Sequence, residues 1–284
     1  MSDNVLITTD HAEGLADDRR FMGLVSVVSG LLVALCGLLP RSFTVVLALL
    51  FVLAFSYGWG TFMQSFVKSS PLTVQIMVAI TGVAGVLAVW ISNDLAAAAM
   101  VLGLVVIAAF ISEMMRSLPR KNTLMSVSGT VLGSIFAVLT ASWVSLNEQA
   151  LWHETIFPAG IAVTVIAVAG MFFTKRSFHR VSLFGAGALT GGVTAAILVA
   201  TGVLDRLKIV VLSTVPYMSQ HPHVALVVAG VALGIVFAGL IVFSSFFADY
   251  SHHVFGASER ICFGVMPVML AGLPLYTFIR VVGT

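Results

Sequence analysis

The chain has 284 residues, of which 59% are hydrophobic and only 9% are charged, and its mean hydropathy is +1.09. Soluble domains carry about 25% charged residues, so this composition excludes a protein with a fully polar, water-exposed surface. Twelve acidic and fourteen basic side chains leave a net charge of +2. Nucleic-acid-binding proteins concentrate much more positive charge, so the composition indicates an integral membrane protein and no nucleic-acid partner.

Nine apolar stretches are long enough to be transmembrane helices. A helix needs about 20 mostly apolar residues to cross a hydrocarbon core of roughly 30 Å. Helices are expected because lipid offers the backbone no hydrogen-bond partners. In chain order, the predicted helices cover residues 21–39, 43–66, 72–92, 95–115, 124–144, 156–174, 181–204, 224–247 and 261–279. The sequence therefore predicts an all-α integral membrane protein, a bundle of about nine transmembrane helices forming one domain over residues 21–284.

The positions of Lys and Arg predict the orientation of this bundle. If the N-terminus is inside, ten basic residues fall in or next to inner loops and four in outer ones. Inner loops carry the excess of Lys and Arg in membrane proteins, so we expect the N-terminus inside and the C-terminus outside, in the inner (plasma) membrane. Residues 1–20 hold five acids, unlike the basic start of a secretory signal, and are predicted to be a short, disordered cytoplasmic tail.

Glu113 is the best candidate for a polar site inside the membrane. It lies near the inner end of the predicted helix 95–115, and Arg116 follows three residues later. Ionisable groups within membrane spans are costly and are therefore functional candidates. Two interpretations stay open: an ion pair of Glu113 with Arg116 at the membrane boundary, or a carboxylate that faces a polar cavity.

Residues that could bind a metal or catalyse a reaction are few. Asp249, His252 and His253 could share one helical face, but metal sites usually need three or four protein ligands, and nothing nearby in the sequence completes this set. The chain has no phosphate-binding loop, no Gly-x-Ser-x-Gly elbow and no His-Glu-x-x-His pair. We therefore expect a non-enzymatic protein without catalytic residues, metal or cofactor.

Pairs of glycines occur in three of the predicted helices, and two prolines occur in the last one. Gly-x-x-x-Gly pairs occur at residues 129/133, 187/191 and 230/234, and small residues at this spacing let two membrane helices approach closely. The last predicted helix contains Pro267 and Pro274, each of which removes a backbone donor and tends to kink a helix. We predict close helix packing at the glycines and bends at the prolines.

A basic inner loop precedes the glycine-rich helix 181–204. A basic loop that leads into a helix N-terminus suits an anionic head group, although the same charges also follow from the orientation of the chain. The loop after the eighth predicted helix lies on the same side. The candidate anionic head-group site consists of Lys175, Arg176, His179, Arg180, Asp249, His252, Glu259 and Arg260.

The order of these features resembles the CDP-diacylglycerol synthase (phosphatidate cytidylyltransferase) family. Shared features are the chain length, the early hairpins, a tryptophan in the third segment (Val89-Trp90), a small-residue fifth segment (126–141), and a basic loop running into a glycine-rich helix (182–196). The resemblance covers most of the chain as hydropathy and spacing. It implies a membrane protein that handles phospholipids.

The catalytic motifs of that family are missing from this chain. The acidic cluster that precedes the basic loop is replaced by residues 169–174, which contain no carboxylate. Of the long C-terminal signature, only Asp249 and Glu259-Arg260 have counterparts. Nucleotidyl transfer needs several carboxylates to hold Mg²⁺, so the resemblance implies a catalytically degenerate relative.

Two functions follow from the sequence. The first is a non-enzymatic permease or the membrane subunit of a larger complex, because buried polar groups and catalytic constellations are scarce. The alternative is a phospholipid-handling membrane protein with its head-group site on the cytoplasmic side. The expected partners are the lipid bilayer, an anionic phospholipid, and other membrane or cytoplasmic subunits.

Overall fold

The computed structural model describes residues 3–66, 71–115, 123–146, 152–172, 176–200, 222–250 and 255–283. Within these ranges the chain is almost entirely helical and contains no strand, which confirms the all-α prediction for this part of the chain. The helices are α1 (Asp3–Cys36), α2 (Arg41–Phe66), α3 (Pro71–Ser92), α4 (Ala96–Met114), α5 (Thr123–Leu139), α6 (Ala141–Leu146), α7 (Trp152–Phe172), α8 (Arg176–Ala200), α10 (Pro222–Tyr250) and α11 (Ala257–Gly283).

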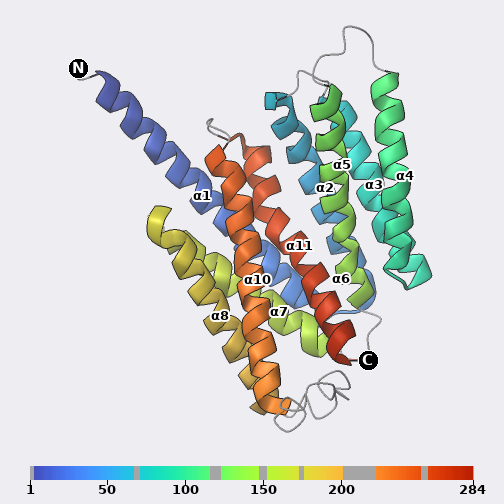
Figure 1. Cartoon of the computed structure of the whole chain (residues 1–284), viewed down its shortest axis with the longest axis vertical. Helices are drawn as coiled ribbons and strands as arrows, with labels where there is room; N and C mark the ends of the chain where they lie inside the picture. Colours follow the sequence, from blue (N-terminus) through green and yellow to red (C-terminus); the bar gives the residue numbers. More distant parts are fainter. Residues whose placement is uncertain are drawn as a thin grey trace.

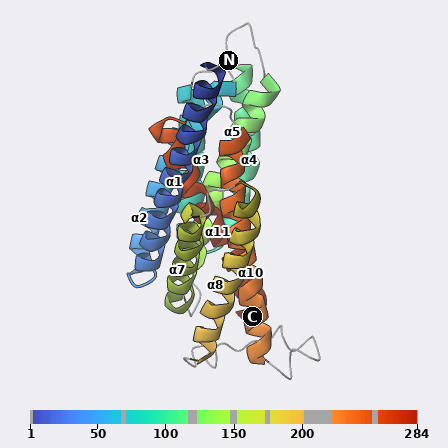
Figure 2. The same ribbon diagram turned by 90° about the vertical axis from the view of Figure 1, so that its left-hand side faces the viewer.

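Eight helical stretches of the described residues are long and apolar enough to cross a membrane, and α7 adds a shorter one, Ile156–Met171. Each of the nine predicted segments overlaps one of these stretches. The two chain ends lie at opposite ends of the bundle in both views (Figures 1 and 2), as an odd number of crossings requires. We call the end at which α1 enters the N-side of the bundle; α11 also begins there.

The predicted disordered tail is wrong for the described residues 3–20. α1 runs without interruption from Asp3 to Cys36, and its first half projects beyond the other helices (Figure 1). The sequence of this part contains a single glycine, Gly14, and no proline, so nothing stops the helix from extending past the apolar run. At residue 18 the helix is already part of the bundle, because Asp18 is only 1% exposed.

The predicted fifth helix is interrupted at Thr140. The Thr140 N–H donates to the Ala137 carbonyl oxygen at 3.3 Å, and the Trp143 N–H donates to the Thr140 carbonyl oxygen at 3.2 Å. These bonds reach back three residues and tighten the turn. The Trp143 indole N–H donates to the Val268 carbonyl oxygen of α11 at 2.9 Å, so the short helix α6 is attached to α11.

α11 lies between two groups of helices (Figure 1). One group contains α2 to α6, and the other contains α1, α7, α8 and α10. The span of α11, Ala257–Arg280, is 72% buried, the highest share among the spans of the described residues. A helix that is buried on most sides must contact both groups, and the bundle is therefore organised around α11.

The α2–α6 group is packed with aromatic rings, and we call it the aromatic group. Trp59 stacks on Phe55 with ring centroids 5.4 Å apart, and Phe136 of α5 meets both rings edge-on. Phe62 packs edge-on against Phe263 of α11 at 4.8 Å. Such pairs add stabilisation beyond their buried area, so this cluster joins α2, α5 and α11 firmly.

The aromatic side of α2 packs against the first glycine pair, which lies on α5. The Trp59 indole N–H donates to the Gly129 carbonyl oxygen at 3.0 Å. A Cβ atom at Gly133 would collide with this indole ring, and one at Gly129 would collide with Met63. The predicted packing role of this pair is confirmed, and its partner is a tryptophan rather than a second glycine.

The group of α1, α7, α8 and α10 is packed through small residues, and we call it the glycine group. Gly187 of α8 faces Gly234 of α10, and Gly191 faces Gly230. A Cβ atom at any of the four would meet backbone atoms of the opposite helix. The predicted role of these two pairs is confirmed: each forms the surface against which the other packs.

Candidate functional site

The residues of the predicted sites fall into three classes in the structure. Glu113 is buried on α4, with 7% of its surface exposed. Arg116, Lys175 and His252 lie outside the described residues, so the Glu113–Arg116 pair stays a prediction. For four other residues the structure describes the backbone but not the side chains. Arg176, His179 and Arg180 lie in the first turns of α8, and Asp249 lies in the last turn of α10.

Glu259 and Arg260, the remaining two, lie in the first turn of α11 on the N-side. The Gly256 N–H donates to Oε2 of Glu259 at 2.9 Å. A carboxylate that binds a free N–H at a helix start is the N3 half of a capping box, and its charge also suits the helix dipole. This contact therefore gives Glu259 a structural role at the start of α11.

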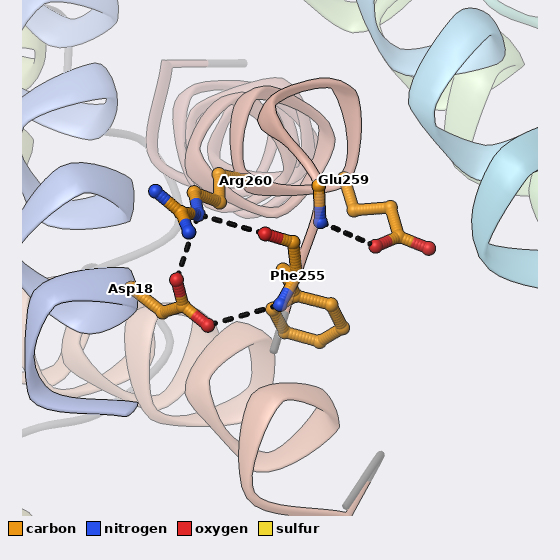
Figure 3. Close-up of polar contacts among 5 residues, drawn as sticks. Asp18, Phe255, Glu259 and Arg260 are labelled. Atoms are coloured by element: carbon orange, nitrogen blue, oxygen red, sulfur yellow. Dashed lines mark hydrogen bonds and ion pairs between the residues drawn. The ribbon is translucent and has the colours of Figure 1, made fainter. Parts of the chain in front are cut away.

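Arg260, which is partly exposed, forms an ion pair with the buried Asp18, a residue that the predicted site does not include (Figure 3). Nε of Arg260 lies 2.7 Å from Oδ1 of Asp18. Its N–H donates to the Phe255 carbonyl oxygen at 3.0 Å, and Oδ1 receives no hydrogen bond of good geometry in the described structure. The two charges therefore attract each other without a directed Nε–H bond to the carboxylate.

The second oxygen of Asp18 binds the backbone just before α11. The Phe255 N–H donates to Oδ2 of Asp18 at 3.0 Å. The guanidinium of Arg260 also lies 5.9 Å from the centre of the Phe21 ring on α1, a cation–π distance. Asp18 and Phe21, both on α1, thus contact the same arginine and hold the start of α11 against α1.

Burial makes this arrangement sensitive to change. Asp18 is 1% exposed, whereas the Arg260 side chain is 28% exposed. An ionised carboxylate away from water is stable only when it is paired and hydrogen-bonded, and here one oxygen has the cation and the other has a backbone N–H. Removing either charge would leave its partner with an uncompensated desolvation cost.

A small pocket opens on the N-side between α1, α7 and α10. Its volume is about 40 Å³, which exceeds the roughly 10–15 Å³ that one water requires. One arginine and three serine hydroxyls face a wall of apolar side chains and glycines. The lining residues are Arg19, Met22, Gly23, Ser26, Ala167, Gly170, Ile241, Ser244 and Ser245.

The three serines donate their hydroxyl hydrogens to backbone carbonyls. Ser26 Oγ lies 2.6 Å from the Gly264 carbonyl oxygen of α11. Ser244 donates within α10 at 2.9 Å and Ser245 at 2.7 Å. With the hydrogens used in this way, the oxygens still accept bonds, so the pocket combines an arginine donor with hydroxyl acceptors.

The start of α8 reaches the level of this pocket. α8 and α10 are antiparallel, with Gly187 opposite Gly234 and Gly191 opposite Gly230. Moving eleven residues back along α8 from Gly187 reaches Arg176, and eleven residues forward along α10 from Gly234 reaches Ser245. The backbone register thus brings the start of the predicted basic segment to the level of the pocket, although none of the lining residues belongs to α8.

Sequence reasoning missed Asp18, Arg19 and the pocket serines. A usable signal existed, because Asp18, Met22 and Ser26 are spaced by four residues and share one face of a helix. All three are buried. The expectation of a disordered tail up to residue 20 hid this pattern.

Among the described residues, no group of three or more His, Cys, Asp or Glu side chains could hold a metal ion. The residues that come together on the N-side are instead an ion pair, a helix cap and a pocket with one arginine. No family model, curated protein or solved structure matches this chain.

Proposed function

We propose that this protein is a non-enzymatic permease of the plasma membrane whose two helix groups move relative to each other along α11. The observation that carries the proposal is the position of α11. It lies between the aromatic group and the glycine group, and the Asp18–Arg260 pair joins its first turn to α1.

The contacts of α11 suggest which surface moves. On the aromatic side, the Trp143 indole donates to the Val268 carbonyl oxygen of α11. The Ser258 hydroxyl of α11 lies 3.1 Å from the Thr61 hydroxyl of α2. Together with the ring cluster, these contacts favour α11 and the aromatic group as one unit. The α1–α11 surface, fastened by Asp18–Arg260 and Ser26, is then the surface that opens.

Proline supplies flexibility within α11. Pro267 and Pro274 both lie inside the helix, where each removes a backbone hydrogen bond and permits a bend. Because Ser258 and Phe263 precede Pro267 and pack on α2, the part of α11 before the prolines stays with the aromatic group, and α1 is the helix that moves away from it. The proposal requires no metal and no cofactor, and it places the N-side in the cytoplasm, as the positive-inside rule predicts.

Two other roles remain as competing proposals. The chain could be the membrane subunit of a larger complex, in which the Asp18–Arg260 pair only fixes the fold. A phospholipid-handling protein with the layout of the CDP-diacylglycerol synthases is favoured by one observation, the arginine-containing pocket on the N-side. Lipid handling is compatible with a permease that moves an amphiphile.

The test separates these roles with one purified sample. The full chain is isolated in mild detergent, co-purifying proteins are identified by mass spectrometry, and the chain alone is reconstituted in liposomes. A permease should transport fluorescent phospholipids or another member of a solute panel faster than protein-free liposomes. Asp18→Asn should change that rate several-fold, and Asp17→Asn should leave it unchanged because Asp17 is exposed. A stoichiometric partner together with no transport by the reconstituted chain contradicts the permease.

A further inference from the structure

We infer that the pocket between α1, α7 and α10 binds the phosphate of an anionic phosphoryl compound, with Arg19 as its main ligand. The depth of the pocket favours a phospholipid head group as the source of that phosphate. The inference rests on the proposed permease in one respect, because it names the class of substrate that the permease would move.

The pocket lies at the depth of lipid head groups. Arg19 is two residues inside the apolar span that starts at Asp17. Ser26 is seven residues further, or about 10 Å at 1.5 Å per residue. Ser244 and Ser245 lie in the last residues of the span Leu226–Phe246. The polar layer of a bilayer begins at the edge of its hydrocarbon core, so the pocket reaches from that layer into the core.

The charges around the pocket suit an anion. A guanidinium has five N–H donors in a planar fork that matches phosphate oxygens, so Arg19 can bind a phosphate and keep another partner. The backbone of α8 places residues 176 and 180 at the levels of Ser245 and Ile241, outside the lining of the pocket itself. On the acidic side, Asp18 is paired with Arg260, and Asp249 lies one turn beyond Ser245.

The shape and wall of the pocket suit an amphiphile. A volume of about 40 Å³ holds a compact polar group and not a whole lipid. The serine oxygens can accept from a hydroxyl of the head group. Next to the pocket residues in sequence, Leu24, Phe243 and Phe246 are 40–51% exposed, and their apolar surface would contact acyl chains.

Native mass spectrometry of the full-length chain in mild detergent tests the inference directly. Phosphatidic acid, phosphatidylglycerol and phosphatidylcholine are titrated separately, and inorganic phosphate is then added as a competitor. The two anionic lipids should bind more tightly than phosphatidylcholine. Arg19→Gln should weaken their binding about ten-fold or more, as expected for loss of a charge-assisted contact, and Arg19→Lys should weaken it less.

Arg20→Gln is the matched control, because Arg20 is the next residue, carries the same charge and is exposed. It should bind as the unchanged protein does. Equal weakening by Arg19→Gln and Arg20→Gln would overturn the inference, since general surface charge would then explain binding. Ser245→Leu fills the pocket without changing charge and should also weaken binding; unchanged binding in this folded variant contradicts the pocket as the site.

Competition by inorganic phosphate shows whether the site binds free phosphate or only the phosphate of a lipid head group. Displacement of lipid at millimolar phosphate indicates a site for free phosphate as well, whereas lipid binding that phosphate does not disturb assigns the site to the head group. The readout is occupancy and not transport. Arg19-dependent binding without transport would support the pocket and contradict the permease, and transport without such binding would do the reverse.

Discussion

The aromatic group and the glycine group solve the same packing problem in opposite ways. Lipid removes most of the hydrophobic drive for helices to associate, so contacts must come from close packing and hydrogen bonds. α2 and α5 fill their interface with rings, and Trp59 also bonds to Gly129. α8 and α10 instead bring their backbones together at four glycines.

The two ways of packing are accompanied by cavities of different size and lining. The pocket of about 40 Å³ with its arginine and serines is formed entirely by helices of the glycine group. A smaller cavity of about 10 Å³ next to Trp143 lies between the two groups, because residues of α1, α2, α6 and α7 line it, and these are almost all apolar. Of these two spaces, the larger one, which also has a charged side chain in its lining, lies within the glycine group. We therefore place rigidity in the aromatic group and binding in the glycine group.

The largest effect is expected for Gly191→Leu on α8. Its side chain would collide with the Gly230 backbone of α10 and force the two helices apart, which should lower the free energy of unfolding by about 3 kcal/mol or more. Gly185→Leu on the same helix is the control, because nothing lies within 4 Å of a Cβ atom there. Thermal unfolding in detergent measures both; equal losses would contradict the glycine interface.

Asp18→Asn is expected to have the next largest effect. It leaves Arg260 beside a neutral amide and should lower the free energy of unfolding by about 2 kcal/mol, less than a fully buried pair because Arg260 is partly exposed. Asp17→Asn removes the same charge from an exposed position and should stay within about 0.5 kcal/mol of the unchanged protein. Denaturant titration compares them, and a stable Asp18→Asn variant speaks against a structural ion pair.

Trp143→Phe tests the attachment of the aromatic group to α11. The change removes the indole donor from the Val268 carbonyl oxygen and should lower the free energy of unfolding by about 1 kcal/mol. Trp90→Phe is its control, since Trp90 is 45% exposed. If the two variants unfold at the same temperature, the Trp143 contact does not join α6 to α11 as described.

The smallest effect is expected for Gly170→Ala at the pocket wall. The added Cβ atom would lie 3.4 Å from Leu183 and 3.8 Å from Ile241, which are ordinary van der Waals distances. Stability should therefore change by less than about 0.5 kcal/mol. Gly160→Ala, where the Cβ atom would meet the Ala34 nitrogen at 2.6 Å, should unfold at a clearly lower temperature. The reverse order would contradict the described α1–α7 packing.

The sequence predicted the helices well because membrane spans depend on length and hydropathy, which are local properties. The glycine pairs could be predicted for the same reason, since the spacing of two glycines along one helix shows that they share a face of that helix. The break at Thr140 could not, because no glycine or proline marks it in the sequence and the Trp143–Val268 bond beside it joins distant parts of the chain. The Asp18–Arg260 pair joins residues 242 positions apart, and no local pattern identifies such a partner. Asp18 could still have been suspected from its spacing with Met22 and Ser26.

Motion of the two helix groups about α11 can be measured directly as a change in the distance between them. Leu124 on α5 and Val181 on α8 are 82% and 73% exposed, and both lie near helix starts on the N-side. After replacement of the buried Cys36 and Cys262 by Ala, spin labels at 124 and 181 report this distance by double electron–electron resonance. We predict two distance populations in liposomes and a shift between them in Asp18→Asn. One narrow distance that Asp18→Asn does not alter would contradict this motion.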